Sequence, residues 1–125
     1  MFIYTGIDIV ENRRIGEAIK KHGSRFLNRI FTENEVKYCF SKAEYVSCFS
    51  ARFAAKEAFI KAFYQAYKKT LPLKSIEIKG STGKPAEILL HPPDKEVESI
   101  LNRIKYTFSI SHEKNYSVAV VIIYF

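Results

Sequence analysis

The segment 52–62, Arg-Phe-Ala-Ala-Lys-Glu-Ala-Phe-Ile-Lys-Ala, places charged residues among alanines and large apolar side chains. At about 3.6 residues per turn, Arg52 and Lys56 share one row of a helix, and Glu57 and Lys61 share another. A solvated amphipathic helix would put its charges opposite an apolar stripe, and a buried helix would have none. The pattern therefore favours a cleft that holds phosphates and a metal. The plainer alternative is a set of surface contacts between residues four apart, worth a few tenths of a kcal/mol.

A second carboxylate, Asp8, follows Gly6 and Ile7 in an otherwise apolar stretch. The glycine allows another segment or a ligand to approach the backbone closely. Taken alone, Asp8 is better explained as a cap of the following turn or helix. Together with Glu57 it forms the kind of carboxylate pair that holds Mg²⁺ on a phosphate substrate, with waters and phosphate oxygens completing the octahedron. The helix cations could then bind the remaining phosphate charge.

A third concentration of polar groups lies in the stretch Phe-Ser-Ile-Ser-His-Glu at 108–113. The pattern predicts a strand that carries two hydroxyls on one face and ends at a histidine, where binding groups often gather. His112 could donate to a phosphate or act as an acid, whereas His22 and His91 are interpreted as surface residues. The chain has no nucleophile-elbow serine, Walker loop or dinucleotide fingerprint, which argues against a Ser-His-Asp hydrolase and the common nucleotide-binding classes.

The elements that must position these residues follow the apolar periodicity. We expect strands over 2–9, 75–79, 87–90, 107–111 and 116–124, with the second and third joined as a hairpin through the turn-forming residues 80–85. We expect helices over 11–23, from a capping box at Thr32, over about 44–67, and over 92–103. Helices and strands are segregated along the chain, so the predicted fold class is α+β.

Composition limits the classes of protein to consider. A chain of 125 residues with 47% hydrophobic residues predicts one domain, 1–125, and a net charge of +7 favours an acidic partner such as nucleic acid, anionic lipid, an acidic protein or a polyphosphate. The apolar start is too short for a membrane span and lacks the features of a signal peptide. Cys39 and Cys48 are expected to be separate, reduced packing residues in a cytoplasmic protein.

Four segments of the chain together resemble the holo-acyl-carrier-protein synthases, a family of small 4'-phosphopantetheinyl transferases, in order and in spacing. These segments are 6–8, 52–63, Gly83-Lys84-Pro85 and Ser109-Ile110-Ser111-His112. The resemblance covers nearly the whole chain. It implies Mg²⁺-dependent transfer of phosphopantetheine from coenzyme A to a serine of an acyl carrier protein, in support of fatty acid biosynthesis, with adenosine 3',5'-bisphosphate as the second product. It also implies the family fold, an antiparallel sheet packed against a long helix, and a homotrimer with active sites between subunits.

The resemblance also implies roles for particular residues. Asp8 and Glu57 match the Mg²⁺ ligands, and with Lys61, which matches a lysine near the phosphate, they form the expected catalytic set. The implied coenzyme A contacts are Arg52, Lys56, Lys61, Gly83, Lys84, Pro85, Ser111 and His112, some of them supplied by a neighbouring subunit. A metal and lysines placed there would stabilise the charge that develops as the carrier serine attacks the β-phosphate. The general base stays open between Glu57 and a metal-bound water.

One position departs from the family pattern. The family usually has a glycine after the Lys-Ala-Phe step, and Tyr64 stands there in this chain. Its bulk puts in doubt the shape of the adjoining coenzyme A pocket or subunit contact. The metal and phosphate residues are unaffected.

Basic residues near Asp8 are candidates for docking the acidic carrier protein. They are Arg13, Arg14, Lys20, Lys21 and Arg25, with Arg14 the strongest single candidate; a solvated basic face is the alternative. A Mg²⁺-dependent nucleic-acid-binding protein or nuclease would also fit the charge, but the aromatic residues follow core patterns and no stacking motif is present. A noncatalytic interaction subunit is a further alternative, which the intact Asp8, Glu57 and Lys61 argue against. We therefore expect neither a nucleic acid nor a membrane partner.

Overall fold

The computed structural model describes residues 1–81 and 84–125. The elements follow in the order β1 (Ile3–Glu11), α1 (Asn12–His22), α2 (Ser24–Ile30), α3 (Glu33–Phe40), α4 (Tyr45–Tyr67), the 3-10 turn η1 (Leu73–Ser75), β2 (Ile76–Ser81), β3 (Lys84–Leu90), α5 (Lys95–Leu101), β4 (Tyr106–His112) and β5 (Tyr116–Tyr124). No helix within the described ranges is both long and apolar enough to cross a bilayer.

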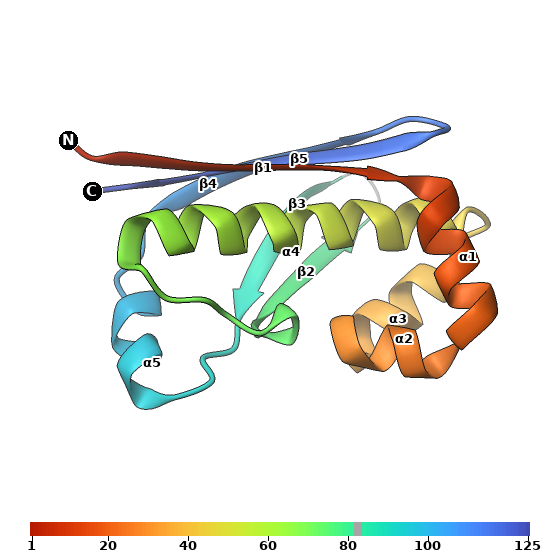
Figure 1. The fold of residues 1–125 in the computed structure, drawn as a ribbon, viewed down its shortest axis with the longest axis horizontal. Helices are drawn as coiled ribbons and strands as arrows, with labels where there is room; N and C mark the ends of the chain where they lie inside the picture. The colour runs from red at the N-terminus through yellow and green to blue at the C-terminus, as the bar shows by residue number, and fades with distance from the viewer. Residues whose placement is uncertain (82–83) are drawn as a thin grey trace.

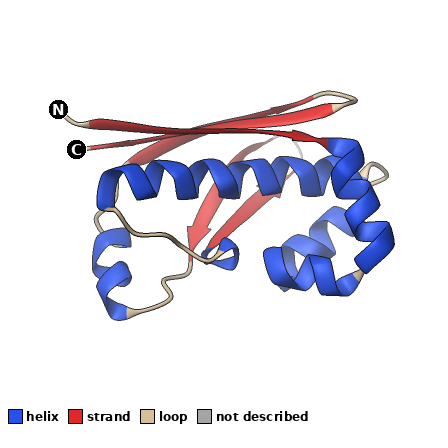
Figure 2. Cartoon of the chain, in the orientation of Figure 1, coloured by secondary structure: helices blue, strands red, loops and turns tan. Residues whose placement is uncertain are grey.

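The long helix α4 lies between two antiparallel sheets (Figures 1 and 2). The larger sheet has the strand order β1-β5-β4, and the smaller one is the β2-β3 hairpin. Helices α1 to α3 gather at one end of α4, and α5 lies near the other end. The two termini run side by side, because Phe2 and Phe125 exchange backbone hydrogen bonds of 2.6 and 3.1 Å. The expected α+β fold with an antiparallel sheet on a long helix is confirmed.

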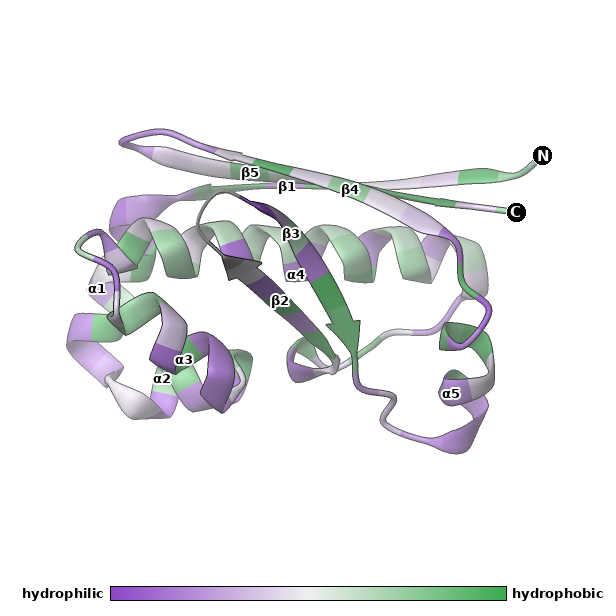
Figure 3. Cartoon of the chain, turned by 180° about the vertical axis from the view of Figure 1, so that it is seen from behind, coloured by the Kyte–Doolittle hydropathy of each residue, from purple (hydrophilic) through white to green (hydrophobic). Residues whose placement is uncertain are grey.

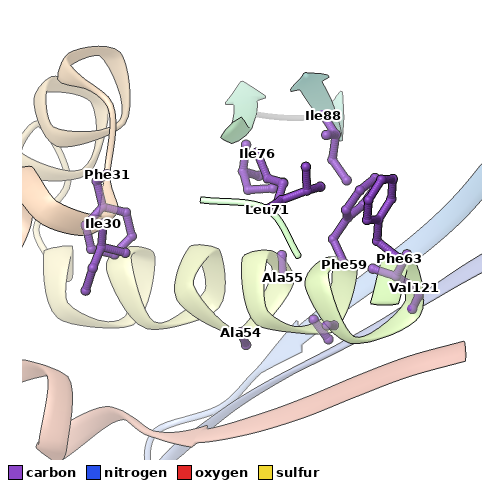
Figure 4. Packing of buried hydrophobic residues seen from close by; sticks show 14 of the residues in the cluster. Ile30, Phe31, Ala54, Ala55, Phe59, Phe63, Leu71, Ile76, Ile88 and Val121 are labelled. Carbon is purple, nitrogen blue, oxygen red and sulfur yellow. The ribbon is translucent and has the colours of Figure 1, made fainter. Parts of the chain in front are cut away.

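Helix α4 can be covered on both sides because it is apolar around most of its circumference, as the pale green of Figure 3 shows. Its alanines let the larger sheet approach: a Cβ added to Gly6 would lie 1.9 Å from the carbonyl oxygen of Ala58. Only glycine fits there, which confirms the close approach expected of that residue. On the hairpin side, Phe59 and Phe63 point toward Leu71 and Ile88 and complete the core (Figure 4).

Among the short helices, α3 was predicted from the sequence and α2 was not. The capping box is confirmed: the Glu35 amide donates to Thr32 Oγ1 at 3.3 Å, and the Thr32 amide donates to Glu35 Oε1 at 2.9 Å. Helix α2 was not expected, although the buried residues Leu27 and Ile30 show the three-residue spacing of a helix. It follows Gly23, whose φ of 55° separates it from α1.

The two cysteines do not pack as separate thiols. A disulfide joins Cys39 in the last turn of α3 to Cys48 in the first turn of α4, with Cα atoms 5.5 Å apart. The expectation of two reduced packing residues is therefore wrong for this structure. The pairing depends on the short connection 41–44 that turns α4 back beside α3, and the spacing of two cysteines in a sequence does not report such a turn.

Candidate active site

A first cluster joins β1 to α4 through Lys61. The Lys61 ammonium donates to Asp8 Oδ1 at 3.2 Å and to the Ile7 carbonyl oxygen at 3.0 Å. The Asp8 side chain is 17% exposed and the Lys61 side chain 53%, so the pair lies at the edge of the core and open to solvent. Glu57 lies one helical turn before Lys61 on the same row. Burial, together with the nearby Asp8 carboxylate, raises the pKa of Glu57, while Lys61 acts in the opposite sense.

Strand β1 positions Asp8 by its alternation. Gly6, Asp8 and Val10 face α4, whereas Ile7 and Ile9 face away from it and are exposed. The contact of Gly6 with Ala58 brings this part of β1 against the helix. The Asp8 carboxylate therefore comes to lie beside the helix row that carries Glu57 and Lys61, from a position about fifty residues earlier in the chain.

The donor set of this cluster fits Mg²⁺. The Asp8 carboxylate contributes to the raised pKa of Glu57, so a cation placed between the two would relieve repulsion, and carboxylate oxygens are ligands that Mg²⁺ prefers. No group of three or more His, Cys, Asp or Glu side chains suited to a metal occurs among the described residues. A cation on Asp8 and Glu57 would therefore need waters or substrate oxygens as further ligands, as Mg²⁺ on a phosphate substrate does.

A second cluster surrounds a cavity of about 400 Å³ between α3, α4, the β2-β3 hairpin and β4. Its lining brings together three of the residues expected to bind coenzyme A: Arg52, Lys84 and His112. Gly80, Ala86 and Ile110 add apolar and backbone surface to the wall, and Lys42 and Glu44 also line it. Residues from five separate elements thus converge on this cavity.

Arg52 is the most constrained cation of the cavity. It is 8% exposed, its guanidinium stacks on the Tyr38 ring at 4.6 Å, and its Nη1 donates to Cys48 Sγ at 3.3 Å. Its Nε is buried without a hydrogen-bond partner in the described part of the chain. Burial lowers the pKa of Arg52, and the Glu35 charge opposes that effect, but a guanidinium stays protonated near pH 7. A buried cation with spare donor capacity suits an anionic ligand such as a phosphate.

Lys56 takes no part in either cluster. Its side chain is fully buried, and its ammonium pairs with Glu35 Oε1 at 2.8 Å and donates to the carbonyl oxygens of Leu73 and Ile76. The expectation that Lys56 contacts coenzyme A directly is therefore corrected: it has no exposed surface with which to contact a ligand. Its row on the helix faces the hairpin and the Thr32–Glu35 cap, which the sequence did not reveal.

The remaining expected coenzyme A contacts lie at different places. Ser111 is exposed and, by the alternation of β4, lies on the face opposite to His112. Pro85 is exposed on β3 beside Lys84 and does not line the cavity. Gly83 lies outside the described residues. Tyr64, the departure from the family pattern, is 55% exposed near the end of α4, on the row of Glu57.

The two clusters face different sides of the molecule. Arg52 and Lys61 are nine residues apart on α4, which at about 100° per residue puts them roughly half a turn apart around the helix axis. Asp8 and His112 come from β1 and β4, which β5 separates in the sheet. One chain by itself therefore does not bring the metal-type cluster and the phosphate-type cavity into a single cleft.

The expected docking residues are spread over two helices. Arg13 is paired with Glu11 and Glu17, each at 3.0 Å. Arg14 is exposed and has no ion pair within the described ranges. Lys21 lies in the last turn of α1, whereas Arg25 belongs to α2 beyond the Gly23 turn. Sequence reasoning missed Lys114, which shares a cavity of about 590 Å³ with Arg13 and Lys20.

Comparison with known proteins assigns the chain to a family. Residues 4–121 match the family model described as the 4'-phosphopantetheinyl transferase superfamily. The holo-acyl-carrier-protein synthase of Aquifex aeolicus is 43% identical over 118 residues, covering 94% of this chain and 95% of that protein. The enzyme of the same name from Koribacter versatilis is 40% identical and covers 98% of both chains.

Solved structures agree with this assignment. The Chronobacterium ammoniagenes ACPS-CoA complex superposes with a TM-score of 0.79 at 26% identity, covering 98% of this chain and 97% of that one. The Helicobacter pylori holo-acyl-carrier-protein synthase in complex with coenzyme A gives 0.74 at 30% identity, covering 96% and 99%. The chain therefore belongs to the 4'-phosphopantetheinyl transferase superfamily, and the family expected from its motifs is confirmed.

Proposed function

We propose that this chain transfers the 4'-phosphopantetheine group from coenzyme A to a serine of an apo acyl carrier protein, giving the holo carrier and adenosine 3',5'-bisphosphate. The observation that carries the proposal is the Asp8, Glu57 and Lys61 cluster in a chain of this family. The reaction would support fatty acid biosynthesis. It would take place in the cytoplasm, where coenzyme A and carrier proteins meet.

The residues of the first cluster supply most of the chemistry. Mg²⁺ held by Asp8 and Glu57 would bind oxygens of the coenzyme A pyrophosphate and offset their negative charge. The Lys61 ammonium, fixed by its bonds to Asp8 and to the Ile7 carbonyl oxygen, keeps a positive charge at the same edge of β1. Charge develops on the bridging oxygen as the serine attacks, so a preorganised cation there lowers the barrier. Arg52, Lys84 and His112 would hold the remaining phosphate of coenzyme A.

A complete site would require two chains, and a homotrimer with sites between subunits supplies them. Two features support this proposal. The clusters lie roughly half a turn apart around α4. The outer face of the larger sheet is also apolar: Ile3, Ile7 and Ile9 are 58 to 66% exposed, and Ile7 and Ile9 pair with the apolar residues Val120 and Val118. An uncovered apolar face of this kind suits a contact with another subunit.

The transfer itself is tested by mass. The purified chain is incubated with coenzyme A, Mg²⁺ and an apo carrier protein, and the carrier is weighed before and after. A gain of one phosphopantetheine supports the proposal. No gain from any of several acidic apo carriers, with a folded enzyme, contradicts it, and Mg²⁺-dependent cleavage of nucleic acid in a parallel reaction would support the rival class.

The shared site is tested by mixing two impaired variants, assayed at a coenzyme A concentration well below the KM of the parent. Glu57→Gln removes the metal-type cluster and His112→Ala weakens the phosphate-type cavity. After the two are unfolded and refolded together in equal amounts, about a quarter of the interfaces would join an intact cluster to an intact cavity. We expect activity to return to about that fraction in the mixture and not in either variant refolded alone. Absence of recovery, with mixed oligomers shown by mass, would place both clusters of a working site in one chain.

A further inference from the structure

Asn12 is a buried polar residue at the junction of β1 and α1. It is 5% exposed, and its side chain uses both its donor and its acceptor group. Its Oδ1 accepts from the Ser117 hydroxyl at 2.8 Å, and its Nδ2 donates to the carbonyl oxygens of Glu113 at 2.9 Å and Lys114 at 3.2 Å. Its backbone amide donates to the Asn115 carbonyl oxygen at 2.8 Å. No other residue type of this size supplies two donors and an acceptor in that arrangement.

The partners of Asn12 belong to the turn that follows His112 and to the start of β5. Residues 113–115 connect β4 to β5, and Ser117 lies opposite His112 in the antiparallel ladder. The turn is also closed internally, because Glu113 Oε1 accepts from the amides of Asn115 and Tyr116. It is therefore a defined unit, and the Asn12 side chain attaches it to the β1–α1 junction, next to the Glu11–Tyr116 pair that ends the β1–β5 ladder.

The position of this turn bears on the proposed site. His112 lines the cavity that holds Arg52 and Lys84, and Asn12 and His112 line a neighbouring cavity together. The exposed imidazole at the end of β4 has no hydrogen bond of its own within the described ranges. Its location is thus set by the backbone that carries it, which the His112–Ser117 pair of the β4–β5 ladder fixes together with the turn that Asn12 binds.

We propose that Asn12 is a positioning residue for coenzyme A, because it fixes the β4–β5 turn and thereby the place of His112. The inference rests on the proposed function, since it assigns Asn12 to the same site. Asn12 itself need not touch the ligand. Its loss would leave the buried Ser117 hydroxyl and the part-buried carbonyl oxygens of Glu113 and Lys114 without their partner, so the turn would shift to find others.

The test uses Asn12→Asp, which has nearly the same shape. The new carboxylate oxygen faces the carbonyl oxygens of Glu113 and Lys114 and repels them. We expect the KM for coenzyme A to rise by about tenfold, with kcat changed by less than about threefold. The defect should shrink as the pH falls, because a protonated carboxyl can again donate to one carbonyl. Ser117→Ala, which removes one of the bonds, should give a smaller change in the same direction.

A double-mutant cycle separates positioning from general loss of structure. If Asn12 acts through His112, then Asn12→Asp should change the KM for coenzyme A less than about twofold in a His112→Ala background. Asp94→Ala serves as the matched control, since it removes the cap of α5 at the far end of α4 and should lower the Tm without changing that KM.

The outcomes are distinct. A full and additive effect of Asn12→Asp in the His112→Ala background, or an unchanged KM in both Asn12→Asp and Ser117→Ala, overturns the inference while the parent still transfers phosphopantetheine. A parent that transfers nothing overturns the proposed function instead, and the assignment of Asn12 to that site falls with it.

Discussion

Lys56 and Glu57 are neighbours in the chain, yet the structure gives them opposite surroundings. Lys56 is sealed in the core with Glu35, whereas Glu57 faces Asp8 and Lys61 at an open edge. Residues adjacent on a helix point about 100° apart, so the same motif serves structure on one row and chemistry on the other. The sequence shows the charges, but the identity of the buried partner depends on how α3 packs, and no local spacing reports it.

At the residue scale, Glu57→Gln should abolish most turnover and leave the fold intact, because it removes a metal-binding charge without changing size. Asp8→Asn should behave alike. Steady-state rates with saturating Mg²⁺, alongside circular dichroism of each variant, check this. Rates near those of the parent would show that the two carboxylates are not needed for the reaction.

The stability of the metal-free protein should fall as the pH rises, because of Glu57. The folded state raises the pKa of Glu57, so its proton is held more tightly when folded, and the stability this gives is present at low pH and lost as the pH rises through the folded pKa. In EDTA near pH 7, Glu57→Gln should therefore have a higher Tm than the parent. The difference in Tm should vanish toward about pH 4. Mg²⁺ should raise the Tm of the parent only. Equal Tm values at both pH values in EDTA would contradict the raised pKa of Glu57, which burial and the Asp8 charge cause.

At the scale of elements, periodicity predicted α4, the hairpin and the strands of the larger sheet to within a few residues. Those elements have strong local signals, namely apolar periodicity and turn formers, and α3 has its capping box. What failed depends on tertiary contact. The Cys39–Cys48 disulfide and the burial of Lys56 both arise where α3 meets α4.

The ion pair of Lys56 and Glu35 should matter for stability rather than for coenzyme A. It ties α4 to the cap of α3 and to the start of β2, where Glu35 Oε2 also accepts from the Ile78 amide at 2.8 Å. Lys56→Met leaves a buried carboxylate unpaired and should lower the free energy of unfolding by about 3 to 5 kcal/mol. The KM for coenzyme A should change little in the folded fraction.

The double variant Lys56→Met/Glu35→Gln provides the control for that loss. Removing the orphaned charge should restore part of the stability, which urea unfolding midpoints would measure. If the double variant is as unstable as the sum of the single variants, the loss comes from packing and not from the unpaired charge.

At the scale of the whole molecule, part of the net charge of +7 lies at one end. Helices α1 and α2 gather Arg14, Lys21 and Arg25 at one end of α4, and the hydrophilic colouring of that end in Figure 3 agrees. At this end, α1 begins directly after β1, the strand that carries Asp8. An acidic carrier drawn to it would bring its serine toward the metal-type cluster.

Arg14→Glu should therefore raise the KM for the carrier protein by about tenfold, with little change in the KM for coenzyme A. Arg14 is exposed at the start of α1, a few residues after Asp8, and reversing its charge replaces attraction with repulsion. Arg13→Glu should do less, because Arg13 is already paired with Glu11 and Glu17. Added salt should shrink the Arg14 effect, since exposed charges are screened.

Lys105→Glu is the matched control for this charge reversal. It changes the net charge by the same amount at an exposed position just before β4, far from α1 along the molecule (Figure 1). If docking is local to α1, initial rates against carrier concentration at low salt should separate Arg14→Glu from Lys105→Glu. Equal increases in the carrier KM would mean that overall charge attracts the carrier, and an unchanged KM in Arg14→Glu would mean that the carrier approaches a different face.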